Sequence, residues 1–166
     1  NTGSWRYAAG DGQGDMSQFG WQVMLLTTAE LSGIAIPEVT RFRMQRFVDR
    51  MSVGRAGGLA SYQRGHRPSR TMTAESLVCR QFLSIELTAD AEREAFDYLQ
   101  QQRAGQGRLN LYYCYYASLA LVQYRAPRWQ EWVSEMETTL RRQQRTTSSL
   151  AGSWDPDTKW GGYGGR

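Results

Sequence analysis

The side chains best suited to chemistry in this chain of 166 residues include a cluster of tyrosines. Tyr112, Tyr113 and Tyr116 lie close together at the start of an apolar segment. Aromatic rings that line a cavity stabilise apolar or cationic ligands. Buried tyrosines are also ordinary core residues, and packing against neighbouring helices is the simpler interpretation. The cluster is therefore a candidate ligand-binding site for which both interpretations stay open.

Glu75 is a second candidate, because it is the acidic residue of a mostly apolar segment. If its carboxyl group faces a cavity, the loss of hydration makes it a candidate acid. In the other interpretation the carboxylate lies in the first turn of a helix and stabilises the N-terminus electrostatically. The second interpretation needs no cavity, and it is the one that we favour.

A basic loop precedes that segment, within the sequence GRAGGLASYQRGHRPSR. Arg64, His66 and Arg67, together with free N–H groups at the start of a helix, form a candidate site for a phosphate or diphosphate group. Such a site suits an isoprenoid diphosphate. A flexible, solvated loop is the plainer interpretation of the same residues.

Composition argues against several classes of function. Arginine supplies 19 of the 20 basic residues, but acidic residues are spread among them, so no basic patch for nucleic acid is indicated. Cys79, Cys114 and the single histidine are too few for a disulfide framework or a metal site. We therefore expect two buried free thiols, no metal and no cofactor. No apolar run approaches the roughly 20 residues that span a bilayer, and the compartment is not indicated.

Helical periodicity predicts three apolar helices. We assign Asp15, Thr71 and Asn110 as their N-caps, because each is a short polar residue directly before an apolar run. The first of these helices is apolar on nearly all sides and ends at Gly33, so we expect it to be buried on most sides. The apolar segments cover residues 15–33, 71–85 and 110–123.

An amphipathic helix is expected after each apolar one, and Pro37 and Pro127 are suited to open two of them. The chain is thus predicted to be all-α, with three pairs of an inner, apolar helix and an outer, amphipathic helix. The pairs cover approximately residues 15–51, 71–102 and 110–145. The predicted apolar stripes are Met44, Phe47, Val48 and Met51 in the first outer helix, and Trp129, Trp132, Val133, Met136 and Leu140 in the third.

The tripeptide G-S-W occurs twice, at residues 3–5 and 152–154. In both places it precedes a charged residue and a glycine-rich stretch. We interpret the two copies as the same boundary of a repeat, three helix pairs apart. The chain begins with Asn1, and we expect flanking repeats beyond both of its ends.

The stretch LRRQQRTTSSLAGSWDP resembles the QW motif of squalene and hopene cyclases, with Gln143 or Gln144 as the glutamine and Gly152 and Trp154 as its G-x-W. The apolar helices resemble the inner helices of bacterial proteins with prenyltransferase and squalene oxidase repeats. The resemblance implies a single domain that is part of an α/α toroid: three of its inner–outer hairpins, with the inner helices around a central cavity.

The catalytic motifs that the resemblance would require do not occur in this chain. It has no D-x-D-D motif of the cyclases, no Asp-Cys-His zinc triad of the prenyltransferases and no G-C-G-E-Q of the thioester toroids. The nearest acidic pair flanks Pro156 and is typical of a turn. Whether the chain is an enzyme is left open by its sequence.

We therefore expect a repeat module that binds a partner or ligand, such as an apolar or isoprenoid-like molecule, on its concave face. One alternative is a fragment of a cyclase-like or prenyltransferase-like enzyme that acts on isoprenoids, and another is a toroid that binds or cleaves carbohydrate. We also expect self-association through the terminal hairpins, because apolar lateral faces without neighbours favour it. The residues of these faces are Trp21, Leu25, Leu26, Trp129, Trp132 and Met136.

Overall fold

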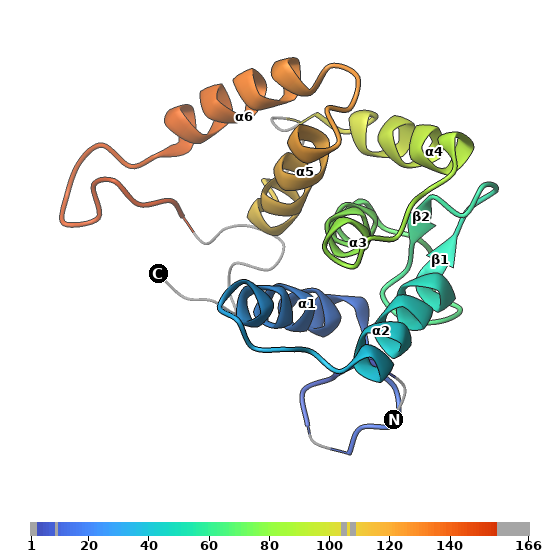
Figure 1. The fold of residues 1–166 in the computed structure, drawn as a ribbon. Coiled ribbons are helices and arrows are strands. Elements are labelled where there is room, and N and C mark those ends of the chain that lie inside the picture. Colours follow the sequence, from blue (N-terminus) through green and yellow to red (C-terminus); the bar gives the residue numbers. More distant parts are fainter. Residues whose placement is uncertain (1–2, 9, 104–105, 107–108, 156–166) are drawn as a thin grey trace. The chain divides into compact units, whose positions relative to one another are not determined.

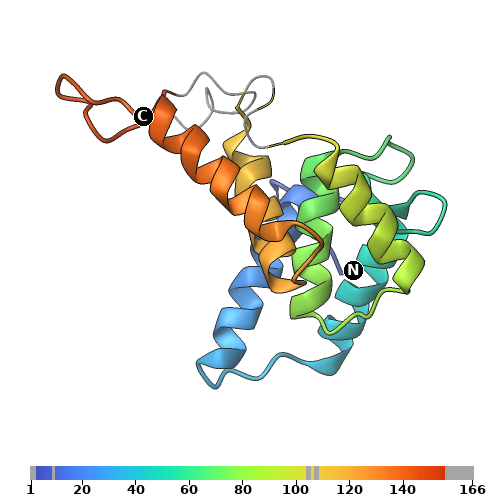
Figure 2. The same ribbon diagram turned by 90° about the horizontal axis from the view of Figure 1, so that it is seen from above.

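The computed structural model describes residues 3–8, 10–103, 106 and 109–155, and within them it confirms the all-α prediction. The described residues form six helices in succession, with a small two-stranded sheet between the second and the third (Figures 1 and 2). The elements are α1 (Met16–Leu31), α2 (Glu38–Met51), β1 (Ser52–Val53), β2 (Leu59–Ala60), α3 (Arg70–Phe82), α4 (Ala89–Gln100), α5 (Leu111–Gln123) and α6 (Trp129–Gln143).

The chain forms two compact units, residues 1–98 and residues 99–166. In unit 1, α3 packs against α1, α2 and β2. Its core includes Phe19 of α1 and Phe47 of α2, whose ring centroids lie 4.7 Å apart. In unit 2, α5 packs against α6, and the rings of Tyr113 and Trp132 meet edge to face at 5.5 Å. Each unit therefore buries aromatic side chains between helices that are close in sequence.

The N-termini of the three apolar helices are capped in the same way. The side chains of Asp15, Ser69 and Asn110 each accept a hydrogen bond from the backbone N–H three residues further on. This confirms the predicted caps Asp15 and Asn110. The prediction of Thr71 was wrong: α3 starts one residue before it, and Ser69 has the extended backbone that a cap requires. Ser69 and Thr71 both have a hydroxyl side chain that is suitable for an N-cap. The backbone conformation decides that Ser69 is the cap.

The C-termini of these helices also share one structure. After α1, Gly33 adopts a φ of +85°, its N–H donates to Glu30 and the next N–H donates to Ala29. This paired arrangement is a Schellman motif, and it confirms the predicted end of α1. Ser84 after α3 and Arg125 after α5 take the same position with φ of 54° and 48°. The equivalent hydrogen bonds lead back to Gln81 and Arg80, and to Val122 and Leu121.

The helices α2 and α6 follow the predicted amphipathic pattern in part. The four residues of the predicted stripe in α2 are all buried, which confirms it. In α6 only Trp132 of the predicted stripe is buried, together with Thr139, while the other stripe residues are partly exposed. Pro37 directly precedes α2, whereas Pro127 lies in a turn and Trp129 is the first residue of α6.

The small sheet lies in the segment that the sequence predicted to be a loop. Ser52 pairs with Ala60 and Val53 with Leu59, in antiparallel order. The N–H of Ala60 donates to Oγ1 of Thr73 at 3.0 Å, so β2 is fixed to α3 by a buried side chain. The strands are too short to give a visible alternation of apolar and polar residues, and this is why they were missed.

The two G-S-W tripeptides have a feature of backbone conformation in common. Gly3 and Gly152 adopt φ of +72° and +88°, a region that favours glycine. In the second copy, the indole N–H of Trp154 donates to the carbonyl of Leu140 in α6 at 2.8 Å. The amide of Gln144, and not that of Gln143, donates to the carbonyl of Gly152 at 2.8 Å. These bonds hold the loop against the end of α6.

Candidate functional site

Glu75 is fully buried, as its interpretation as a candidate acid requires. It does not lie in the first turn of α3, so the interpretation that we favoured was wrong. Its carboxyl group lies against the backbone of Gly20 in α1, and a Cβ atom at Gly20 would stand 2.0 Å from Oε1. The site of Glu75 is therefore the contact between two helices of unit 1, and a glycine provides the space for it.

Tyr113 and Tyr116 are buried, and Tyr112 is half-buried. The hydroxyl of Tyr113 donates to the carbonyl of Leu99 at 2.8 Å, and its ring packs against Trp132. The rings of Tyr112 and Tyr116 meet edge to face at 5.2 Å. For Tyr113 these contacts agree with the packing interpretation, because both its ring and its hydroxyl have partners within unit 2.

Arg64, His66 and Arg67 are exposed, and the ring of His66 lies 6.2 Å from that of Tyr62. N–H groups earlier in the same sequence stretch, in the turn between β1 and β2, have a partner within unit 1. The backbone N–H groups of Arg55, Ala56 and Gly58 donate to the carboxylate of Glu94 in α4, at 2.6, 3.1 and 2.9 Å. These three N–H groups form a cradle for an anion, and the anion is a carboxylate of the same chain.

Arg70, the first residue of α3, is also engaged in packing. The guanidinium group of Arg70 lies 4.7 Å from the ring centroid of Tyr98, and its Nε donates to the carbonyl of that residue. The adjacent loop is held at Gly58, where a Cβ atom would stand 2.0 Å from the carbonyl oxygen of Ala91. The contacts of Arg70 therefore fix α4 to the start of α3, and those of Gly58 and Glu94 fix α4 to the loop between β1 and β2.

A polar cluster at the N-terminus of α1 was not predicted from the sequence. Asp15 is fully buried, accepts from the N–H of Gln18 and the hydroxyl of Ser17, and has Nε of Arg6 at 3.7 Å from Oδ2. Tyr62 lies beside it. Burial, a hydrogen bond with Tyr7 and the charge of Asp15 raise the pKa of Tyr62, so its phenol stays protonated. Tyr7 and Tyr62, which lie in the glycine-containing segments before α1 and α3, are the sequence signal that could have indicated this cluster.

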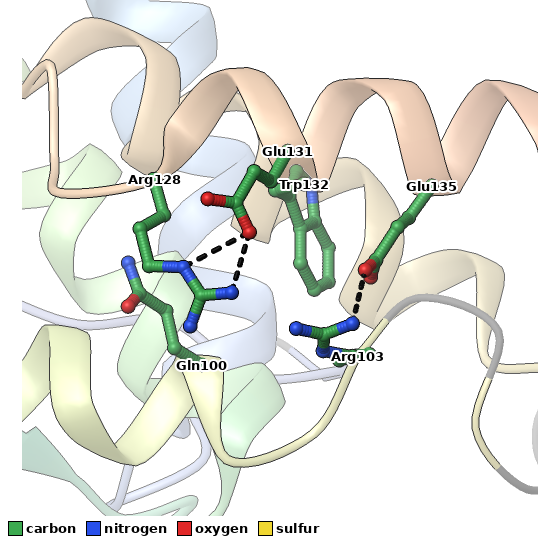
Figure 3. Close-up of a pocket in the computed structure, with 6 residues that line it drawn as sticks. All are labelled: Gln100, Arg103, Arg128, Glu131, Trp132 and Glu135. Carbon is green, nitrogen blue, oxygen red and sulfur yellow. Dashed lines mark hydrogen bonds and ion pairs between the residues drawn. The ribbon is translucent and has the colours of Figure 1, made fainter.

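Unit 2 contains a charged cleft between the end of α4 and the start of α6 (Figure 3). Arg128 donates from Nε to Glu131 at 2.9 Å, and Arg103 pairs with Glu135 at 2.7 Å. The hydrogen bond from Arg128 lowers the pKa of Glu131. The indole of Trp132 lies between the two ion pairs. The cleft measures about 30 Å³, whereas ligand pockets measure about 300–1,000 Å³, so it is too small for such a ligand.

Both cysteines are free and buried, as predicted. Burial raises the pKa of Cys114 from 9.0 to about 11. Burial, and then the charge of Glu75, raise the pKa of Cys79. Within the described part of the chain, no three His, Cys, Asp or Glu side chains form a group that could hold a metal ion.

We expect both thiols to react slowly with a disulfide reagent such as dithionitrobenzoate at pH 8. For Cys114 the pKa alone lowers the thiolate fraction about 100-fold relative to a thiol of pKa 9, and burial slows the reaction further. The measurement compares the native protein with protein unfolded in guanidinium. Because unfolded thiols ionise at lower pH than folded ones, stability should also fall as the pH rises from 9 towards 11. Rapid native reaction at pH 8 contradicts the burial of the thiols.

No protein-family model, curated protein or solved structure matches this chain. Among the described residues, no helix combines the length and the apolar character needed to cross a membrane.

Proposed function

We propose that the chain is a helical-repeat module of the α/α-toroid type, which binds a partner or ligand through apolar surface and carries out no reaction itself. Three pairs of helices support the repeat, because α1, α3 and α5 have the same side-chain N-cap and the same C-terminal motif. The bonds of Gln144 and Trp154 to the G-S-W loop and α6 support the comparison with the QW motif.

One contrast carries the binding proposal. The candidate chemical groups Glu75, Tyr113 and the N–H cradle around Glu94 are used in packing. The apolar helices α1 and α5, in contrast, leave large apolar side chains exposed: Trp21, Leu25 and Leu31, and Leu111, Tyr115 and Val122. Exposed apolar surface of this kind is typical of binding sites for proteins or apolar ligands. A second copy of the chain is the protein partner that we propose.

The absence of catalysis is tested by incubation with squalene, and with farnesyl diphosphate and a cysteine-containing peptide. We expect mass spectrometry to detect neither cyclised squalene nor prenylated peptide, because this chain has no D-x-D-D motif and no zinc triad. Boiled protein is the control for the spontaneous reaction. Product above that control would support the alternative of an isoprenoid enzyme.

The type of ligand is tested by titration with farnesol and with farnesyl diphosphate, followed by tryptophan fluorescence. We expect farnesyl diphosphate to bind no more tightly than farnesol, because residues 16–29 and 111–123 contain no charged residue that could recognise a diphosphate. An Arg64→Ala/Arg67→Ala variant should bind both equally well. If farnesyl diphosphate binds more tightly than farnesol, and the Arg64→Ala/Arg67→Ala variant loses this difference, the binding site is in the basic loop.

A further inference from the structure

The inner helices α1, α3 and α5 can be compared residue by residue when positions are counted from their N-caps. At positions 6 and 10, α3 carries Glu75 and Cys79, and α5 carries Tyr116 and Ala120; all four are buried. In α1 the same positions are occupied by Trp21 and Leu25, which are 53% and 61% exposed. One lateral face of the inner helices is therefore buried in α3 and α5 and exposed in α1.

The opposite lateral face shows the reverse pattern. At position 5, Gly20 of α1 and Ala74 of α3 are buried, whereas Tyr115 of α5 is 45% exposed. At position 1, Met16 of α1 is buried and Leu111 of α5 is exposed. The face formed by positions 1 and 5 is thus buried in α1 and exposed in α5, where it carries the large side chains of Leu111 and Tyr115.

The contact between α1 and α3 shows how two such faces meet. Glu75, at position 6 of α3, lies against Gly20, at position 5 of α1. Near the other end, Leu83 lines the same small cavity as Leu26 and Thr27 of α1, so the two helices run in the same direction. Position 6 of one inner helix therefore packs on position 5 of its neighbour, in parallel orientation.

The exposed faces also lack the charges that keep helix surfaces in water. Residues 16–29 and 111–123 contain no Asp, Glu, Lys or Arg, whereas every outer helix carries several. The centres of protein interfaces are depleted of charge and enriched in Trp and Tyr. Both faces have this composition, and each is the counterpart of the other in the α1–α3 register.

We propose that the Trp21–Leu25 face of α1 packs against the Leu111–Tyr115 face of α5 in a second copy of this chain, in the register of the α1–α3 contact. This inference rests on the proposed function and names its partner and surface. Trp21 takes the place of Glu75, and Tyr115 takes that of Gly20. Tyr115 is larger than glycine, so the axes of α1 in one copy and α5 in the other stand farther apart than the axes of α1 and α3 within one chain. The rings of Trp21 and Tyr115 then stack on each other.

The first test is sedimentation equilibrium of the protein over a wide range of concentration. We expect concentration-dependent association, and we expect Trp21→Ser/Leu25→Ser to raise the dissociation constant at least about tenfold, because truncation of buried aromatic anchors costs binding energy. The matched control is Phe42→Ser, which removes a 57% exposed ring of α2 that lies outside both faces. Circular dichroism shows whether the variants are folded, as expected for exposed positions.

The second test fixes the register. Single variants Trp21→Cys and Tyr115→Cys are mixed and oxidised with oxidised glutathione, while the two native thiols remain buried. We expect this pair to form a disulfide-linked heterodimer. In the control, Val39→Cys, at an exposed position of α2, replaces Trp21→Cys, and this pair should cross-link more slowly. A cross-link no faster than this control overturns the register.

The outcomes separate this inference from the proposed function. A protein that stays monomeric at high concentration, or that associates equally well as the Trp21→Ser/Leu25→Ser variant, overturns the inference. Neither result affects the farnesol titration or the product assays. Product formation, in contrast, overturns the non-catalytic function and leaves the sedimentation result unchanged.

Discussion

Replacement of Trp132 by alanine is expected to cost about 3–5 kcal/mol of the free energy of unfolding, the range for truncation of a buried aromatic residue. Trp132 is 5% exposed, packs edge to face on Tyr113 and donates its indole N–H to Oγ of Ser118 at 2.9 Å. Loss of the ring therefore removes both the α5–α6 contact and a hydrogen bond. Urea denaturation followed by circular dichroism measures the effect.

The matched control is Trp154→Ala. Trp154 is half-buried and also donates one indole hydrogen bond, to the carbonyl of Leu140, so the two variants differ mainly in the burial of the ring. We expect a loss of less than about 2 kcal/mol, made up of one hydrogen bond and a part of the apolar burial. Trp132→Phe should lose less than Trp132→Ala, since it keeps a ring. A larger loss for Trp154→Ala contradicts this account of unit 2.

The helices could be predicted from sequence because their signals are local. Apolar periodicity and capping residues lie within one helix, and they gave all six helices and the caps Asp15 and Asn110 correctly. The cap of α3 was misplaced because Ser69 and Thr71 are both suitable by type. Only the backbone, which is extended at Ser69 and already helical at Thr71, distinguishes them.

The candidate site depended on contacts between segments distant in sequence, and these could not be predicted. Glu75 is buried because Gly20, in another helix, makes room for its carboxyl group. The N–H cradle of the basic loop is filled by Glu94, which lies 36 residues after Gly58. The apolar character of α1 predicted burial on most sides, but Trp21, Leu25 and Leu31 are exposed. The sequence of a helix shows which of its sides are apolar. Only the tertiary structure shows which of those sides are packed against other elements.

The second large effect is expected for Phe19→Ala, which should cost about 3–5 kcal/mol of the free energy of unfolding. Phe19 is fully buried in unit 1, with the ring of Phe47 at 4.7 Å and that of Trp5 at 6.3 Å. Truncation leaves a cavity between rings from α1, α2 and the first G-S-W loop. These elements are too rigidly packed to close it without cost. Urea denaturation, followed by near-ultraviolet circular dichroism of the aromatic cluster, gives the measurement.

Phe42→Ala is the control, because it removes the same side chain from α2 at a position that is 57% exposed. The guanidinium group of Arg46 lies 5.9 Å from its ring centroid, a contact in water that contributes little. We expect a change within about 0.5 kcal/mol, as for other surface substitutions. Equal losses for the two variants would mean that Phe42 is covered in the folded protein. In that case α2 would bury a second face besides that of Met44, Phe47, Val48 and Met51, contrary to its amphipathic pattern.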